Sequence, residues 1–451
     1  MLPANDGRTT VDATVTALER ETMRQVGWRL VPLLMLGYFC AYLDRVNVGF
    51  AGLLMNKQLG FSPAVFGFGA GLFFFGYFLF ELPSNLILAR VGARRWMARI
   101  MITWGLISAL NAFVWNVPSF YGVRIALGLA EAGFYPGVVL YLTWWFPSAY
   151  RSRMMAFFQS ASTISLIIGP AVSGQLLRLD GWLGLAGWQW LFLLEALPPI
   201  VMAVVYLVLL TDRPDNAHWL RPDQRDWLNA RIASEMAQRE TIRRFELGDA
   251  LRNSRVWWLT AIYFGQNVAN YGLLIFLPQI VHAFGAGYGM TGVIAALPFV
   301  FGAAAMLIGG WNSDRTGERT WHIAVACLVG AAGLAACALF AGSPVLMMAA
   351  LIVGQIGQSN IVPIFWALPT AMLTGTAAAG GIALINSVGN LGGFAGPYAF
   401  GLVKEYSGSG TLGLVVIAAP LVISAIIVIA LGHDRRLERI PSSRAGQTAR
   451  G

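Results

Sequence analysis

The sequence predicts an all-α membrane protein, with twelve transmembrane helices arranged as two homologous six-helix bundles. Of the 451 residues, 57% are apolar and only 12% are charged, whereas soluble domains carry about 25% charged residues. Apolar stretches of about 20 residues recur along the chain, and each is long enough to cross the ~30 Å hydrocarbon core as a helix. Short sequence patterns also recur in the second half of the chain. These three observations together predict the fold class.

The apolar stretches are rich in Leu, Phe, Ala and Gly. At this length such runs favour helices, because a transmembrane barrel shows short segments of alternating polarity instead. The polar N-terminus shows no short apolar core with a small-residue cleavage site, so we expect no cleavable signal peptide. The twelve predicted spans begin near Leu30, Ala64, Trp96, Phe120, Met154, Trp188, Val256, Met290, Trp321, Val345, Ala377 and Leu412.

One long polar stretch divides these spans six and six. Acidic residues and arginines nearly balance within it, which is typical of a solvated linker that contains an amphipathic helix. The predicted organisation is an N-terminal tail, a six-helix bundle, a linker, a second six-helix bundle and a C-terminal tail, at residues 1–27, 28–211, 212–255, 256–433 and 434–451.

The formal net charge is +9, and its distribution reflects membrane topology. Arginines cluster in alternate loops and in the linker, while the opposite loops hold little beyond Lys57, Arg178 and Lys404. By the positive-inside rule, we expect a multi-pass protein of the cell inner membrane with both termini in the cytoplasm. The lipid bilayer is therefore the expected partner, and no nucleic-acid partner is expected.

Two short patterns repeat on either side of the linker. Arg90 and Gly92 after the second span match Arg315 and Gly317 after the eighth, at an offset of 225 (315 − 90 and 317 − 92). The fifth span carries "GPAVSG" at residues 169–174, and the eleventh carries "GPYAFG" at residues 396–401, an offset of 227 (396 − 169). Two homologous halves with a central site between them are typical of transporters.

The loop after the eighth span has the pattern Gly-x-x-x-Asp-Arg-x-Gly-x-Arg, which resembles the signature loop of the major facilitator superfamily. In the first copy Asn85 and Ala89 replace the glycine and the aspartate, so the resemblance assigns any gating role of that aspartate to the second half alone. The implied gating-loop residues are Gly92, Arg94, Gly310, Asp314, Arg315 and Gly317.

Longer motifs are similar to one family within that superfamily. "LDRVNVGFA", "FFFGYFLFELPSNLILARVGARRW", "RIALGLAEAGFYPG" and "WQWLFLLEALP" occur in the order found in the anion:cation symporter family, the bacterial carboxylate and sugar-acid permeases. The likeness extends from about Trp28 to His433. It implies a transporter of organic anions.

Six ionisable acids and bases lie inside the predicted spans, all in the first half. Charges at membrane depth are costly unless they are paired or hydrated, so they usually mark a pathway or a relay. Arg124 and Glu131 are seven residues apart and share one helix face. Asp44 and Arg45 are adjacent and point about 100° apart, so we expect one to face the span-four charges and the other the central cavity. The six are Asp44, Arg45, Glu81, Arg124, Glu131 and Glu195.

The charges of four of these residues suggest a mechanism. With both acids ionised, Asp44, Arg45, Arg124 and Glu131 sum to zero, and protonation of both acids leaves two positive charges that need an anion. Burial disfavours the charged form of a carboxylate, which makes this protonation feasible. The resemblance implies proton-coupling roles for Asp44 and Glu131 and carboxylate binding by Arg45, while Arg124 would act through ion pairing. The alternative is that these four residues form a structural ion-pair network.

Glu81 and Glu195 are better explained by structural hydrogen bonding. The second half offers neutral polar side chains, which suit a hydroxylated substrate because amides both donate and accept. Interhelical hydrogen bonding is the alternative role for such residues. We expect Trp366 and Pro369 to form a bend or a gate in the tenth span, and the alternative is a proline kink without a role in transport. The candidate substrate contacts are Tyr42, Gln266, Tyr271, Asn386 and Asn390.

The sequence predicts no enzyme activity, no metal site and no cofactor, with the proton as coupling ion. Three interpretations remain: proton-coupled uptake of an organic carboxylate of the tartrate or sugar-acid type, carboxylate efflux or exchange, and a sensor that binds an acid without moving it. A monomer is expected to suffice, because the predicted site lies within one chain.

Overall fold

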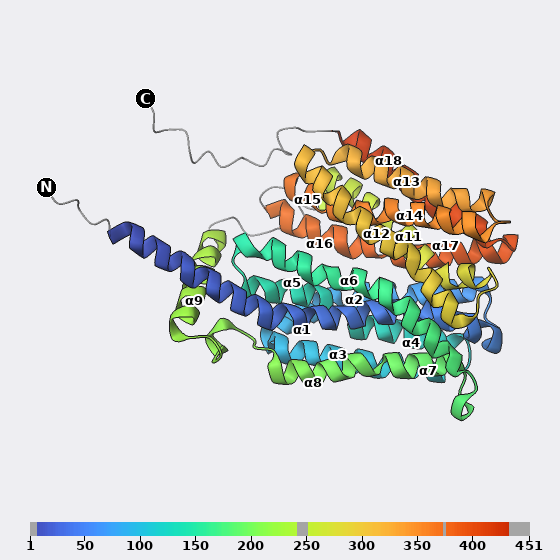
Figure 1. Cartoon of the computed structure of the whole chain (residues 1–451), viewed down its shortest axis with the longest axis horizontal. Coiled ribbons are helices and arrows are strands. Elements are labelled where there is room, and N and C mark those ends of the chain that lie inside the picture. Colours follow the sequence, from blue (N-terminus) through green and yellow to red (C-terminus); the bar gives the residue numbers. More distant parts are fainter. Residues whose placement is uncertain (1–6, 241–250, 373–375, 433–451) are drawn as a thin grey trace.

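The computed structural model is an elongated helical bundle whose long helices run side by side (Figure 1). It describes residues 7–240, 251–372 and 376–432, and within these ranges no β-strand occurs. The long helices of the first half are α1 (Gly7–Leu59), α2 (Pro63–Val91), α3 (Ala93–Leu110), α4 (Val117–Glu131), α5 (Phe134–Trp145), α6 (Ser148–Leu176), α7 (Gly187–Glu195) and α8 (Leu197–Leu209).

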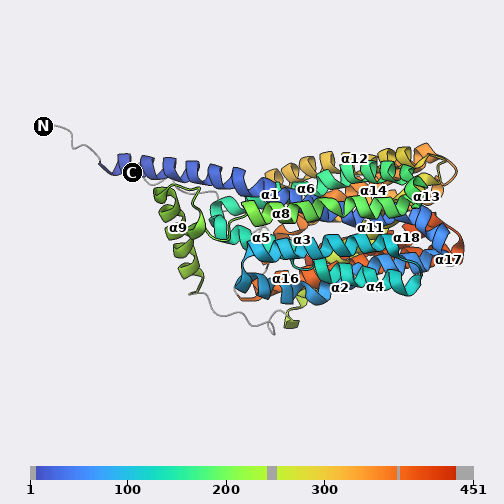
Figure 2. The same ribbon diagram turned by 90° about the horizontal axis from the view of Figure 1, so that it is seen from below.

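Helix α9 (Pro222–Glu240) is the long helix in the described part of the linker, and it runs across one end of the bundle and not along it (Figure 2). The helices of the second half are α11 (Ser254–His282), α12 (Tyr288–Thr316), α13 (Thr320–Leu339), α14 (Pro344–Phe365), α15 (Ala367–Met372), α16 (Thr376–Asn390), α17 (Gly392–Ser407) and α18 (Gly410–Leu431).

The helices make twelve passes along the bundle within the described residues, because α4 with α5, α7 with α8, and α16 with α17 each form one pass, and α15 extends the pass of α14. In the described part of the chain, nine segments are long and apolar enough to span a membrane. The passes outside this set are α3, α11, and α16 with α17. Helix α3 carries three arginines near its start, and the other two passes contain amides, so polar side chains lower their hydropathy.

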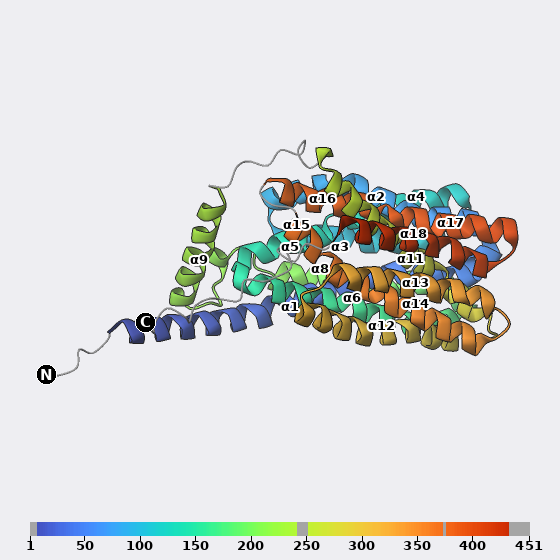
Figure 3. The ribbon, with the colours of Figure 1, turned by 90° about the horizontal axis from the view of Figure 1, so that it is seen from above.

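The start of α1 and helix α9 lie at one end of the bundle, which we call the linker end, and the opposite end is called the far end (Figures 1 and 3). Helix α1 begins at Gly7 and continues without interruption to Leu59. The predicted N-terminal tail of residues 1–27 is therefore helical from Gly7 onward and continuous with the first span. Pro32 lies within this helix.

The two halves pack tightly against each other toward the far end, where α2 contacts α17, α6 contacts α12 and α1 contacts α11. Glycines allow backbone to meet backbone there. A Cβ atom added to Gly67 would lie 2.2 Å from the carbonyl oxygen of Pro397, and one added to Gly292 would lie 2.1 Å from that of Pro170. The repeated GP patterns are thus the segments through which the halves contact each other, and the far end is closed.

The two signature loops are built differently. In the first loop Gly92 has a φ of 97°, which favours glycine, and the Asp212 carboxylate accepts a 2.7 Å hydrogen bond from the backbone N–H of Arg94. In the second loop Arg319 lies 3.9 Å from Asp314, whose side chain is 78% exposed. A carboxylate from the start of the linker therefore occupies the first loop, whose own pattern lacks the aspartate.

Candidate functional site

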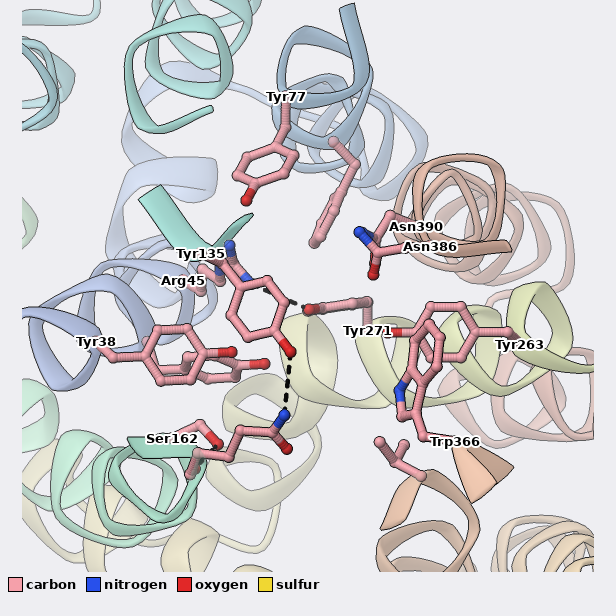
Figure 4. A pocket seen from close by; sticks show the side chains of 14 residues that line it. Tyr38, Arg45, Tyr77, Tyr135, Ser162, Tyr263, Tyr271, Trp366, Asn386 and Asn390 are labelled. Atoms are coloured by element: carbon pink, nitrogen blue, oxygen red, sulfur yellow. Dashed lines mark hydrogen bonds between the residues drawn. The ribbon is translucent and has the colours of Figure 1, made fainter. Parts of the chain in front are cut away.

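A pocket lies between the two halves, about midway along the bundle, and encloses about 130 Å³. Figure 4 shows its walls: Tyr38 and Arg45 face Tyr263 and Trp366 across the opening. The first half contributes Tyr38, Tyr42, Arg45, Phe74, Tyr77, Tyr135, Gln159 and Ser162, and the second contributes Tyr263, Tyr271, Val362, Trp366, Asn386 and Asn390.

Arg45 is the residue of this lining with a permanent charge. Its Nη2 donates to Glu131 Oε1 at 2.7 Å and its Nε donates to the same oxygen at 3.2 Å. Its Nη1 donates to the Tyr271 hydroxyl of the other half at 3.3 Å (Figure 4). The guanidinium also lies over the Tyr42 ring, 5.0 Å from the ring centroid, a favourable cation–π distance. The arginine in the pocket wall is therefore already paired with a carboxylate of the protein itself.

Glu131 owes its position to a break between two helices. Helix α4 ends at Glu131, and Gly133 follows with a φ of 91°, which favours glycine, before α5 begins at Phe134. A Cβ atom on Gly133 would also lie 2.1 Å from the Ser84 hydroxyl oxygen. The side chain of Glu131 is 1% exposed, and its Oε2 has no hydrogen-bond partner among the described residues. A carboxylate at a helix C-terminus gains nothing from the helix dipole, so Glu131 depends on Arg45 for its charge balance.

Asp44 lies on a different face of α1. Its oxygens accept hydrogen bonds from Asn47 Nδ2 at 2.9 Å, from Trp104 Nε1 at 3.2 Å and from the Ser108 hydroxyl. The last two residues belong to α3. The sequence predicted that one of Asp44 and Arg45 faces the span-four charges and the other the cavity. That expectation holds in part: Arg45 lines the pocket, and Asp44 lies within electrostatic range of Arg124. It fails in that Arg45 also pairs with Glu131 of span four, while the hydrogen bonds of Asp44 go to α3 and to its own helix.

Arg124 is 2% exposed and forms no ion pair within 4 Å in the described residues. Its Nη2 donates to the carbonyl oxygen of Ala70 at 3.4 Å, and its guanidinium lies over the Phe73 ring at 5.4 Å. Its Nε and Nη1 have no hydrogen-bond partner among the described residues. The four predicted charges therefore form one ion pair, Arg45 with Glu131, and not a closed network.

The structure brings most of the predicted substrate contacts together. Tyr42, Tyr271, Asn386 and Asn390 all line the pocket with Arg45. Gln266 does not: it is 2% exposed, and its Nε2 donates to the carbonyl oxygen of Gln358 at 3.3 Å. In this structure Gln266 therefore has the alternative role, a hydrogen bond between two helices.

Sequence reasoning missed several tyrosines of the lining, among them Tyr38 and Tyr77. A signal was present in the spacing, because Tyr38, Tyr42 and Arg45 stand at positions i, i+4 and i+7 and therefore share one face of α1. Tyr77 stands three residues after Phe74 on α2 in the same way. The arginine on the same face of α1 could have marked Tyr38 as a residue of the lining.

The chain matches the sequence pattern of the "Major Facilitator Superfamily" over residues 34–397 and 266–449. It is 49% identical to a protein of Agrobacterium vitis named "Putative tartrate transporter", over 94% of each chain. It is 40% identical to a "Quinolone resistance transporter" of Acinetobacter baumannii, over 91% of this chain and 94% of the relative.

A solved structure of the Escherichia coli xylose transporter, in a partially occluded inward open conformation, superposes with a TM-score of 0.72. It covers 91% of this chain and 99% of its own at 14% identity, so the likeness concerns the fold. The resemblance inferred from the signature loop is confirmed. The relatives are named as transporters, and this chain, like them, is a multi-pass membrane transporter and not an enzyme: it belongs to the major facilitator superfamily.

Proposed function

We propose that the protein is a proton-coupled symporter that takes up a small hydroxylated organic carboxylate, such as tartrate or a sugar acid, by alternating access. The observation that carries this proposal is the pairing of Arg45 with Glu131 at the wall of a pocket shared by both halves. Arginine suits the task because its planar fork binds a carboxylate through two hydrogen bonds and keeps its charge.

The charge balance links the substrate to a proton. A substrate carboxylate that binds Arg45 competes with Glu131 for the same guanidinium. Once displaced, Glu131 would be an unpaired buried carboxylate, which is strongly unfavourable. Protonation of Glu131 removes that charge, so the substrate and the proton bind together. One proton per bound carboxylate follows from this pair alone.

Asp44 remains a proposed second proton site, although it reaches the pocket only indirectly. Arg124 lies on the same face of α4 as Glu131, and two of its guanidinium nitrogens, Nε and Nη1, have no hydrogen-bond partner among the described residues. It would stabilise whichever of the two carboxylates is ionised. Arg124 would thus balance the charge of Asp44 when Glu131 is protonated, while Arg45 holds the substrate.

The pocket favours a small substrate with hydroxyl groups. Its volume of about 130 Å³ is below the ~300 Å³ at which sites for drug-sized ligands begin. Tyrosine hydroxyls and the amides of Asn386 and Asn390 supply donors and acceptors beyond Arg45. The Agrobacterium vitis relative, named for tartrate, supports an acid of this kind.

The arginine-rich loops and the linker lie at the linker end, which we therefore assign to the cytoplasm by the positive-inside rule. Uptake across the inner membrane then begins at the far end. A monomer suffices for this cycle, since every residue of the pocket belongs to one chain.

The test is proton movement in proteoliposomes that contain a trapped pH dye. Tartrate, sugar acids, aromatic acids and neutral sugars are added outside in turn, with protein-free liposomes as the control. We expect the lumen to acidify with selected hydroxy acids only. A silent response to every acid, from protein shown to be folded, contradicts symport.

Efflux or exchange is the second candidate, and the Acinetobacter baumannii relative named for quinolone resistance favours it. The same proteoliposomes separate the two functions. Exchange requires acid on both sides of the membrane and moves no net proton, and drug efflux predicts that a quinolone is transported in place of a hydroxy acid.

A further inference from the structure

A second buried carboxylate, Glu81 of α2, joins the two halves on the linker side of the pocket. Its Oε1 accepts a hydrogen bond from Asn386 Nδ2 at 2.9 Å, and its Oε2 accepts one from the Ser387 hydroxyl at 3.1 Å. Both donors belong to α16 of the other half. Glu81 is 6% exposed and forms no ion pair among the described residues. The transport cycle described above makes no use of it.

Side-chain hydrogen bonds connect the halves at three levels in the described part of the chain. At the far end Glu405 of α17 accepts from the Ser62 hydroxyl at 2.6 Å and from the Ala64 N–H at 2.9 Å. In the pocket Arg45 donates to Tyr271. On the linker side stands Glu81, one turn beyond the pocket residue Tyr77 along α2. The halves are therefore held together on each side of the pocket by a carboxylate contact that involves α2.

The two donors satisfy both oxygens of an ionised Glu81, and they do so only while the halves are close. When the halves separate at this end, the carboxylate loses both partners and must be hydrated instead. A contact with these properties has two discrete states, made and broken, as a gate requires.

Asn386 belongs to this contact and to the pocket at once. Its Nδ2 donates to Glu81, while its Oδ1 accepts no hydrogen bond within the described residues. A substrate hydroxyl that donates to this oxygen would fix the amide in the orientation that Glu81 needs. Hydrogen bonds in such a chain strengthen one another.

We propose that Glu81, Asn386 and Ser387 form the gate at the linker end of the pocket, and that a bound hydroxy acid closes this gate through Asn386. The coupling to substrate rests on the proposed function, whereas the gate itself does not. Glu81 is on this view a positioning residue, since it contacts the substrate only through Asn386.

The test measures distances between spin labels in purified full-length protein by double electron–electron resonance. One pair, at Val91 and Trp321, reports the linker end, and a second pair, at Lys57 and Leu339, reports the far end. All four positions are exposed. The buried native cysteines, Cys40, Cys327 and Cys337, are first replaced by serine or alanine.

Without ligand, Glu81→Ala should raise the population with a wide linker-end distance by about tenfold, because a charge-assisted hydrogen bond contributes about that factor to an equilibrium. Glu81→Gln should stay close to the wild type, since its amide accepts from Asn386 and donates to Ser387. Glu405→Ala is the matched control and should widen the far-end distance instead.

Tartrate at saturating concentration should narrow the linker-end distribution of the wild type and of Glu81→Gln, and leave that of Glu81→Ala wide. An unchanged distribution in Glu81→Ala without ligand overturns the gate. Equal widening in Glu81→Gln and Glu81→Ala overturns the hydrogen-bond mechanism. If the linker-end distances of the wild type do not respond to a hydroxy acid that acidifies the lumen in the proteoliposome assay, the coupling is contradicted. Absence of transport in that assay contradicts the proposed symport instead.

Discussion

The two halves share one fold but supply the pocket with different chemistry. The first half contributes the charges, with Arg45 at the wall and Glu131 behind it, together with tyrosines, a glutamine and a serine. The lining residues of the second half are uncharged: tyrosine, tryptophan, valine and asparagine. A substrate that is anionic at one side and hydroxylated at the other would bridge the halves. The charge at the pocket thus comes from the first half alone, whereas the hydrogen-bonding groups come from both halves.

The largest effect should follow from Arg45→Lys. A point charge does not reproduce the two parallel hydrogen bonds of the guanidinium, so we expect substrate affinity to fall about 100-fold, equivalent to about 2.7 kcal/mol. The measurement is equilibrium binding of labelled substrate to purified protein, with Arg178→Lys at the exposed far end as the control. Near-normal affinity in Arg45→Lys would assign the anion contact to another residue.

Glu131→Gln should separate binding from proton coupling. The neutral amide imitates the protonated acid, so exchange of labelled substrate between the two sides persists. Accumulation driven by a pH gradient should vanish, although a gradient of one pH unit concentrates substrate about tenfold when one proton moves with it. Counterflow and gradient-driven uptake are measured in the same proteoliposomes. Undiminished accumulation would assign the proton to another carboxyl group, with Asp44 as the next candidate.

A smaller effect is expected in the second half, where Asn390→Ala removes one amide from the pocket wall. Loss of a neutral hydrogen bond costs about 1 kcal/mol, or about fivefold in affinity. Gln266→Ala is the matched control, because this buried amide lies outside the lining. We expect it to lower the melting temperature with substrate affinity unchanged. The reverse outcome would return Gln266 to the substrate site.

The smallest effect concerns the two signature loops. Asp212→Ala removes the acceptor of the Arg94 N–H in the first loop and should cost about 1–2 kcal/mol of stability. Asp314→Ala in the second loop should cost much less, because exposed ion pairs contribute about 0–1 kcal/mol. Thermal unfolding in detergent compares the two variants, and a larger loss in Asp314→Ala contradicts the assignment of Asp212 to the first loop.

The fold could be predicted from the sequence because membrane spans have a length and a composition set by the bilayer. The place of five residues in the pocket lining could also be predicted, because polar residues inside apolar helices are few. These residues are Tyr42, Arg45, Tyr271, Asn386 and Asn390. The direction in which the Asp44 side chain points could not be predicted, because the positions of two adjacent residues on a helix give only the angle between them and no absolute orientation. The role of Asp212 escaped prediction for a similar reason, since it reaches the first loop only through tertiary packing.

The far-end glycines have one further consequence, for the study of the other conformations of the protein. Since Gly292 and Gly67 meet backbone oxygens of the opposite half, a single added methyl group denies the far end its closed state while leaving the pocket untouched. Gly292→Ala and Gly67→Ala are therefore suitable variants for trapping the form that is open at the far end. That form can then be crystallised, screened for conformation-selective binders, or assayed for which side of the membrane first meets the substrate.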